Sequence, residues 1–266
     1  MLDGPTILAL LGVGLLGGFL GGFLGIGGSV LFIPMLTLFM KSDYHTAQAA
    51  AMVVNVCVGF SASQSHIRSG LVSRRLLTIL VPCAMAASIV GVYLSNQFTG
   101  DAEVYLRRIF GAVMIYVIAA NLHRMARRRW PHAWGHRPRR KPSRGAAAIG
   151  LVGGVMGLST GLLGLGGGSV AVPAQQVLLG MRLRTAVANS SVAIIFSGLL
   201  AAGLKHATLP AGVDPARPWV YVGLLVPTAI IGAAAGAYSS RRVAREWVRL
   251  VLVVFLGWTA LKMLTA

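Results

Sequence analysis

The chain has 266 residues, of which 56% are hydrophobic and 11% are charged, and its mean hydropathy is +0.74. Soluble domains carry about 25% charged residues, so this composition excludes an ordinary soluble domain and indicates a helical protein that crosses a membrane several times. The formal net charge of +18 could indicate a nucleic-acid-binding protein. However, the basic residues gather in short stretches beside apolar segments, without interleaved aromatic residues for base stacking. We therefore expect no nucleic-acid partner.

The first half of the chain holds five apolar segments that we expect to be helices. They cover residues 6–24, 29–40, 46–65, 76–96 and 104–123. The second segment, about 12 residues long, would reach about 17 Å as a helix, which is too short for a hydrocarbon core of about 30 Å. We therefore expect it to form a broken or re-entrant hairpin with the segment before it. A glycine-rich tip inside the membrane needs protein or a water-filled cavity around it.

The second half repeats this pattern. Its apolar segments cover residues 146–163, 169–179, 185–204, 219–239 and 247–265. The sequence GGFLGIGGSVLFIP at residues 21–34 returns as TGLLGLGGGSVAVP at residues 160–173, and the same shift of 139 residues carries Thr46 onto Thr185. The chain is thus a duplication, with residues 1–123 as the first membrane repeat and residues 145–266 as the second. Paired broken helices at matching positions of two membrane repeats are typical of a transport site.

Charge predicts how the repeats cross the membrane. Three spans follow each hairpin, and this odd number of crossings makes the second repeat inverted relative to the first. Between them, residues 124–144 hold nine of the 24 basic residues and no acid, which predicts a cytoplasmic linker that can also contact anionic lipids. This threading places 18 of the 24 basic residues inside and five of the six acids outside. The predicted fold is therefore an all-α polytopic membrane protein with two inverted-topology repeats, each a glycine-rich hairpin plus three transmembrane helices.

The glycine-rich tips are the predicted substrate site. The short helices that follow them would point their N-termini, with unpaired N–H groups and about half a positive charge, toward a common point in the membrane. Such helix ends bind anions, and polar side chains of the third segment of each repeat are candidates to line the same cavity. The candidate substrate-binding residues are Gly27, Gly28, Ser29, Gly166, Gly167, Gly168, Ser169, Asn55, Asn189 and Ser190. Tight helix packing is the alternative role for glycines, and we assign it to Gly14, Gly18, Gly22, Gly153, Gly157 and Gly161.

No sequence motif indicates an enzyme, and we expect no catalytic residue, no metal and no cofactor. A serine hydrolase would favour a GxSG turn, but Val170 directly follows Ser169. No Asp, Glu, Lys or Arg lies at the predicted centre of a span, where carboxylate proton relays and cation sites usually need one. His45, His66 and His206 lie near segment ends, which favours interfacial positions over ligand roles. A gating or proton-sensing role stays open for His66 and His206, which recur at near-matching positions.

The twin motif at residues 21–34 and 160–173, each followed about a dozen residues later by Thr-Ala, resembles the TauE/SafE family of bacterial membrane permeases. The resemblance covers residues 10–264. It implies a multi-pass protein of the bacterial inner membrane that exports small sulfur oxyanions or organosulfonates, such as sulfite, thiosulfate or sulfoacetate. The anion-site argument by itself predicts a small anionic substrate and does not choose among these.

Our leading hypothesis is a secondary transporter, acting as an exporter of small sulfur-containing anions by alternating access. The interior-negative membrane potential would drive an anion outward with about 2.3 kcal/mol per charge per 100 mV. Two alternatives stay open at this point: an anion channel, and a non-transport membrane subunit that scaffolds a partner complex. The oligomeric state is not predicted.

Overall fold

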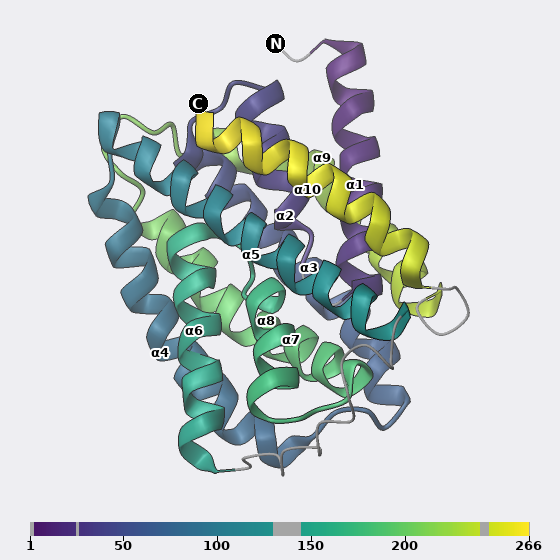
Figure 1. Ribbon diagram of the computed structural model, residues 1–266. Helices are drawn as coiled ribbons and strands as arrows, with labels where there is room; N and C mark the ends of the chain where they lie inside the picture. Colours follow the sequence, from purple (N-terminus) through teal and green to yellow (C-terminus); the bar gives the residue numbers. More distant parts are fainter. Residues whose placement is uncertain (1–2, 25–26, 130–144, 240–244, 266) are drawn as a thin grey trace.

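A computed structural model describes residues 3–24, 27–129, 145–239 and 245–265, and all regular structure in these ranges is helical (Figure 1). All ten predicted segments are found as helices, with ends within a few residues of those predicted, apart from the later end of the last segment in the first repeat. The elements are α1 (Gly4–Leu24), α2 (Ser29–Pro34), the π-helical turn η1 (Met35–Phe39), α3 (Tyr44–Arg68), α4 (Arg74–Gln97), the 3₁₀ turn η2 (Gly100–Ala102), α5 (Glu103–Arg129), α6 (Ala146–Leu163), α7 (Gly168–Leu178), α8 (Leu183–Ala207), α9 (Arg217–Ser239) and α10 (Arg245–Thr265).

Six helices of the described ranges are long and apolar enough to cross a membrane: α1, α3, α4, α6, α8 and α9. The prediction of a multi-pass helical membrane protein is therefore confirmed. The helices that follow the glycine-rich tips are short, as expected, since α2 with η1 ends at Phe39 and α7 has 11 residues. Helices α3 and α8 each have 25 residues and correspond residue for residue under the shift of 139.

Glycines bring two pairs of helices into close backbone contact. A Cβ at Gly18 of α1 would collide with the Ala229 carbonyl of α9, and a Cβ at Gly157 of α6 would collide with the Ala84 carbonyl of α4. These contacts are equivalent, because a shift of 139 carries Gly18 onto Gly157 and a shift of 145 carries Ala84 onto Ala229. The predicted packing role of these glycines is confirmed. The same kind of collision would occur at Gly14, Gly22, Gly153 and Gly161.

Among the six long apolar helices, α3 and α8 are packed most deeply. In the most apolar window of α3, 72% of the residues are buried, and in that of α8 67%, against 33% for α4 and 39% for α9. Their small and polar faces allow this, because both carry alanine, serine and asparagine where the outer helices carry exposed leucine, isoleucine and valine. α3 and α8 pack against each other and each against helices of both repeats. They are therefore the central pair to which the two glycine-rich tips are attached.

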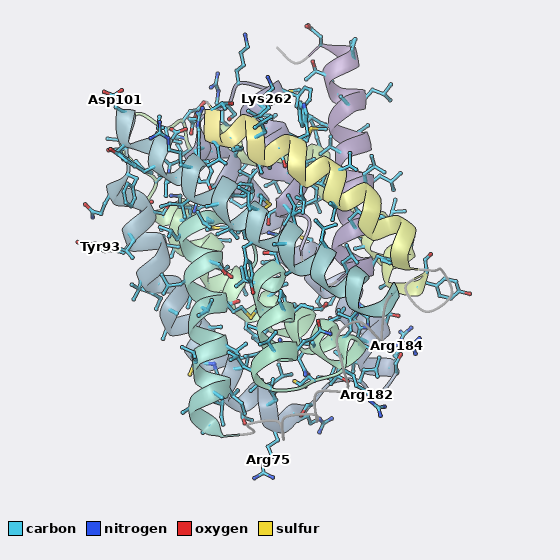
Figure 2. All side chains as sticks on the ribbon, in the orientation of Figure 1. Arg75, Tyr93, Asp101, Arg182, Arg184 and Lys262 are labelled. Carbon is cyan, nitrogen blue, oxygen red and sulfur yellow. The ribbon has the colours of Figure 1, made fainter. Side chains whose placement is uncertain are left out.

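The directions of the helices and the positions of several charged side chains can be followed in Figures 1 and 2. In Figure 1, α1 descends from the N-terminus at the top of the view, whereas its counterpart α6 ascends from the bottom. Figure 2 shows Arg75, Arg182 and Arg184 at the lower end of the molecule, and Asp101 and Lys262 at the opposite end. α5 and α10 pack against each other across one face. Residues 124–129 of the predicted linker continue α5, and its remainder lies outside the described residues.

The glycine contacts predict that a larger side chain placed between α4 and α6 lowers the stability of the protein. Gly157→Val should lower the stability of the purified protein by about 1–3 kcal/mol, because a branched side chain there must push the Ala84 carbonyl away. Thermal unfolding in detergent, followed by tryptophan fluorescence, measures this. Gly154→Val on the same helix is the matched control, because a Cβ there meets no atom within 4 Å. Equal melting temperatures for both variants would contradict the packing role.

Candidate functional site

The side chain of Asn55, in the middle of α3, joins the two glycine-rich tips. Its Oδ1 accepts hydrogen bonds from the backbone N–H groups of Gly28 at 2.8 Å and Ser29 at 3.0 Å. Its Nδ2 donates to the carbonyl oxygen of Gly164 at 3.2 Å, and a Cβ built on Gly166 would lie 3.0 Å from that nitrogen. Asn55 is 1% exposed. The two tips, one from each repeat, thus meet at a single buried carboxamide.

The contact with Asn55 determines which hydrogen-bond donors of the first tip are free to bind a ligand. Gly27 has a φ of +79° and a Cβ there would lie 3.2 Å from the Asn55 Oδ1, so the glycine allows the close approach of the carboxamide. The N–H groups of Gly28 and Ser29, which the sequence proposed for an anion, are occupied by Asn55 in this conformation. The hydroxyl of Ser29 is buried and has no hydrogen-bond partner.

The second tip, unlike the first, has no side chain that accepts hydrogen bonds from the start of its short helix. Gly164 ends α6 and Gly166 and Gly167 follow it, and all three have φ between +66° and +72°, a left-handed conformation that glycine adopts without strain. No side chain caps α7, which begins at Gly168. The hydroxyl of Ser169 is fully buried and lacks a hydrogen-bond partner. The start of α7 therefore combines an uncapped helix N-terminus with an unpartnered buried hydroxyl, the two features that an anion would use.

The other two predicted polar residues lie elsewhere on α8. Asn189 Oδ1 accepts a hydrogen bond from the Ser73 backbone N–H at 2.8 Å, and its Nδ2 is buried without a partner. Ser190 Oγ accepts from Gln175 Nε2 of α7 at 2.8 Å. Asn189 therefore ties α8 to the segment that leads into α4, and Ser190 ties it to α7. The structure brings Gly27, Gly28, Ser29, Asn55 and Gly166 together, whereas the polar groups of Asn189 and Ser190 bond at other points.

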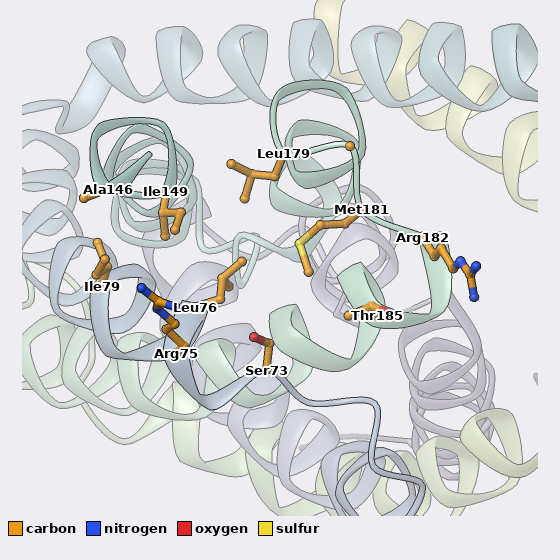
Figure 3. A pocket seen from close by; sticks show the side chains of 11 residues that line it. Ser73, Arg75, Leu76, Ile79, Ala146, Ile149, Leu179, Met181, Arg182 and Thr185 are labelled. Carbon is orange, nitrogen blue, oxygen red and sulfur yellow. The ribbon is translucent and has the colours of Figure 1, made fainter. Parts of the chain in front are cut away.

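A cavity of about 710 Å³ opens near Ser73, at the end of the molecule that carries the arginines (Figure 3). The starts of α4, α6 and α8 and the end of α7 form it. Arg75 and Thr185 add polar groups to its wall, and the Arg182 guanidinium at its rim points outward. The apolar part of the wall comes from Leu76, Ile79, Ala146, Ile149, Leu179 and Met181. The cavity is large enough for a small anion with its hydration water, and its cationic rim favours negative charge.

A buried polar cluster lies at the other ends of α4 and α8; we call it the Lys205 cluster. Lys205 Nζ contacts His45 Nδ1 at 2.8 Å, and it donates to Asn96 Oδ1 at 2.7 Å and to Ser95 Oγ at 3.2 Å. Ser95 in turn donates to Gln48 Oε1 at 2.9 Å. Lys205 is 0% exposed, although it carries the charge that normally keeps a lysine in water.

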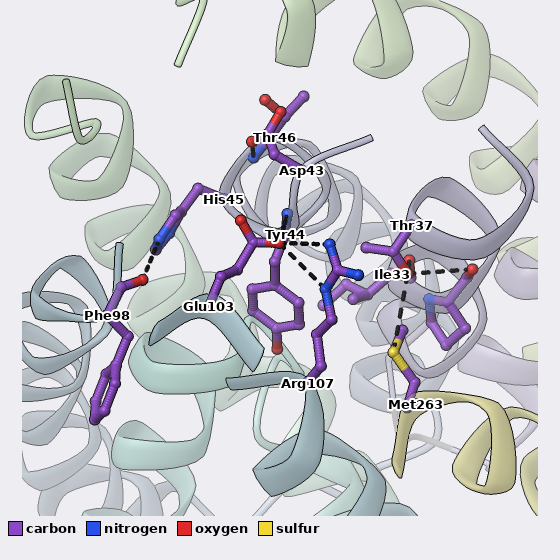
Figure 4. Close-up of polar contacts among 11 residues, drawn as sticks. Ile33, Thr37, Asp43, Tyr44, His45, Thr46, Phe98, Glu103, Arg107 and Met263 are labelled. Atoms are coloured by element: carbon purple, nitrogen blue, oxygen red, sulfur yellow. Dashed lines mark hydrogen bonds and ion pairs between the residues drawn. The ribbon is translucent and has the colours of Figure 1, made fainter. Parts of the chain in front are cut away.

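The surroundings of this cluster are ordered by acidic side chains (Figure 4). His45 Nε2 faces the Phe98 carbonyl oxygen at 2.8 Å. The Glu103 carboxylate accepts from the Tyr44 backbone N–H at 2.7 Å and pairs with Arg107 at the same distance. Asp43 caps α3 by accepting from the Thr46 N–H at 2.7 Å. Capping and pairing fix the start of α3 and therefore the position of His45.

Sequence reasoning did not find this cluster. It treated His45 as interfacial, because this residue lies at the end of an apolar segment, and it gave Lys205 no role of its own. The one available signal was that Lys205 directly follows one apolar segment, while His45 directly precedes another and Ser95 and Asn96 end a third. Nothing in the spacing shows that these four residues meet, since they come from three helices.

Comparisons with known proteins match nearly the whole chain. The family model described as Sulfite exporter TauE/SafE matches residues 10–263. The "Probable membrane transporter protein YunE" of Bacillus subtilis is 26% identical over 92% of this chain and 92% of its own length. A "Probable membrane transporter protein" of Haemophilus influenzae is 23% identical over 89% of this chain and 86% of its own length.

A longer relative is matched over part of its length. The "Probable membrane transporter protein MamO" of Magnetospirillum gryphiswaldense is 25% identical over 99% of this chain, which spans 46% of MamO. No solved structure matches the chain. The relatives are bacterial membrane proteins, so the chain is a multi-pass membrane transporter of the bacterial type, as the apolar helices require.

The bonds of Asn55 predict that its truncation loosens the contact between the tips. Asn55→Ala removes three buried hydrogen bonds and should lower the stability by about 2–3 kcal/mol, since each contributes roughly 1 kcal/mol net. Ser63→Ala on the same helix is the control, because the Ser63 hydroxyl bonds only to the Phe60 carbonyl of its own helix. Thermal unfolding of both variants tests this, and an Asn55→Ala protein as stable as the control would refute the bridging role.

Proposed function

The chain belongs to the sulfite exporter TauE/SafE family, and from this premise we propose that it exports small sulfur-containing anions, such as sulfite, thiosulfate or organosulfonates, by alternating access. The anion enters through the cavity at the arginine-rich end and binds at the glycine-rich tips. The observation that carries the proposal is the meeting of the two tips at Asn55, next to an uncapped α7. Duplicated transporters bind their substrates between such paired broken helices.

The second tip supports the binding step of this proposal. The start of α7 has no side-chain cap and the Ser169 hydroxyl has no partner, so an anion there would gain hydrogen bonds without displacing any. At the first tip an anion would have to replace Asn55, which already satisfies Gly28 and Ser29. We therefore propose the second tip as the main contact and the first tip as a contact made when Asn55 moves.

The inverted orientation of the repeats is part of the proposal. The opposite directions of α1 and α6 in Figure 1 support it, and so does the separation of Arg75, Arg182 and Arg184 from Asp101 and Lys262 in Figure 2. Under the positive-inside rule the arginine-rich end faces the cytoplasm. The cavity then opens to the side from which an exporter takes its substrate.

The test of substrate binding uses Ser169. Ser169→Ala should weaken anion binding by about 0.5–1.5 kcal/mol, the usual contribution of one neutral hydrogen bond, and should leave the unfolding temperature unchanged because no bond within the protein is lost. Isothermal titration of the purified protein with sulfite, thiosulfate and a small alkylsulfonate measures this. Substitutions at Gly28 and Gly167 would be a poorer test, since a side chain there would collide with Phe32 or Met156.

Transport itself is tested in proteoliposomes loaded with each radiolabelled anion. A carrier accelerates efflux when unlabelled substrate is present on the far side, whereas a channel does not. Ser159→Ala serves as the control, because its hydroxyl bonds only to carbonyls of its own helix. No saturable flux of any of the three anions by the parent protein would refute the proposed function and favour a scaffold role.

The proposed orientation predicts opposite accessibility of two exposed positions. In a background with Cys57 and Cys83 replaced by alanine, a cysteine at Arg182 should react with a membrane-impermeant maleimide only from the cytoplasmic side. A cysteine at Asp101 should react only from the other side. Labelling of intact and permeabilised cells measures this, and reaction of both positions from one side would exclude the inverted arrangement.

A further inference from the structure

Helices α4 and α8 run from the cavity to the Lys205 cluster. Leu76 and Thr185, near the starts of these helices, line the cavity, whereas Asn96 and Lys205, near their ends, belong to the Lys205 cluster. Twenty residues of helix span about 30 Å, so the cavity and the cluster lie at opposite ends of the molecule. One end is hollow, and at the other end a lysine of the second repeat is bonded to two helices of the first.

The geometry of His45 fixes its hydrogens. A carbonyl oxygen only accepts, so the Nε2 that faces Phe98 carries a proton. The Nδ1 of a neutral ring then has a lone pair and needs a donor, which Lys205 Nζ supplies at 2.8 Å. One proton lies on the line between Nδ1 and Nζ. Without it, two lone pairs would face each other, and with a second proton, two cations would.

Lys205 Nζ donates to three acceptors, which requires the ammonium form, so with a neutral His45 the pair carries one positive charge. In the ranges that the structure describes, the only ion pair joins Arg107 to Glu103, so no carboxylate lies within 4 Å of Lys205 Nζ. Glu103 and Asp43 act on the pair from a longer distance. His206, the next residue on α8, faces its own helix through the Ala202 carbonyl and packs its ring against Trp219. α6 and α7, which also pack on α8, contain no charged or titratable residue.

We propose that His45 and Lys205 form a binding site for one proton, and that the contact holds the end opposite to the cavity closed while it contains that single proton. The proposal rests on the alternating access proposed above. Opening this end requires α8 to separate from α3 and α4, which breaks the bonds from Lys205 to His45, Ser95 and Asn96. Once separated, His45 takes up a second proton from the adjoining solution, and this proton must leave before the contact forms again.

A chain of hydrogen bonds connects this site to the second glycine-rich tip. Lys205 donates to Ser95, Ser95 donates to Gln48, and Gln48 Nε2 donates to the carbonyl oxygens of Gly161 at 2.9 Å and Leu162 at 3.0 Å. These carbonyls belong to the last turn of α6, directly before the tip. A displacement of Lys205 would therefore shift the end of α6, directly before the predicted anion site, through this chain of hydrogen bonds. Proton binding and anion binding are coupled in this way.

A first experiment examines the proton site without transport. Melting temperatures of the purified parent are recorded between about pH 8 and pH 5, where histidine titrates. As the pH falls, the parent should lose stability, because the unfolded chain binds a proton at His45 that the closed state excludes. His45→Gln replaces the ring by an amide that can still donate to Phe98 and accept from Lys205 but does not titrate, so its acid-side loss should be smaller. Lys205→Met should reduce the loss as well.

His206, which follows Lys205 on α8, provides the matched control. His206→Gln lies outside the Lys205 cluster and should keep the acid-side loss of the parent. Lys205→Arg should keep it too, since it retains a fixed positive charge against His45, and Lys205→Gln, which removes that charge, serves as the second variant if Lys205→Met does not fold. Parent-like acid-side loss in both His45→Gln and Lys205→Met would overturn the proposal, whatever the transport activity.

A second experiment examines coupling in proteoliposomes that contain a pH-sensitive dye. Movement of a small alkylsulfonate, which does not titrate near neutral pH, by the parent should be accompanied by a change in internal pH that is larger than protein-free vesicles show. His45→Gln and Lys205→Met should exchange the anion without this change. A proton signal that persists in both variants would overturn the coupling. If the parent moves no anion but shows the pH-dependent stability, the proposed function fails and the proton site stands.

Discussion

The bonds of the Asn55 carboxamide satisfy backbone that would otherwise have no partner. A glycine-rich turn inside a membrane exposes N–H and C=O groups, and lipid offers them nothing to bond with. Asn55 supplies both an acceptor, for Gly28 and Ser29, and a donor, for the Gly164 carbonyl. A carboxamide can do both at one point, because its oxygen accepts two hydrogen bonds while its NH2 group donates. The broken helices, the burial of the tips and the central place of α3 therefore depend on this one side chain.

The helices were predictable because apolar length and glycine position are local properties. The residues from Ala146 to Leu163 form the predicted helix without a shift at either end, and the short helix after each tip was expected from its length. The packing glycines were predictable because they recur every four residues on one face. The role of Asn55 as a bridge was not, because a buried amide has the same sequence signal whether it binds a ligand or the backbone of another helix.

The two ends of the molecule differ more than a duplication suggests. Under the shift of 139, His45 corresponds to Arg184 and His66 to Lys205. His45 is buried and bonded, whereas Arg184 is exposed. Duplication preserved the helices and their glycine contacts but not the charges at these two pairs of positions. Charges at helix ends change freely when packing does not depend on them, which is why the sequence pattern predicted the fold better than the polar clusters.

The glycine contacts also bear on how the protein is made. The closest backbone approaches join α1 to α9 and α4 to α6, so each links a helix of one repeat to a helix of the other. During synthesis α1 enters the membrane long before α9 exists, and chains emerge at about 5–20 residues per second. For that interval the glycine face of α1 has no partner within its own repeat. A fragment that ends before α6 would therefore present the unpaired glycine face of α1 and the unpaired face of α4 around Ala84 and Gly91 to lipid.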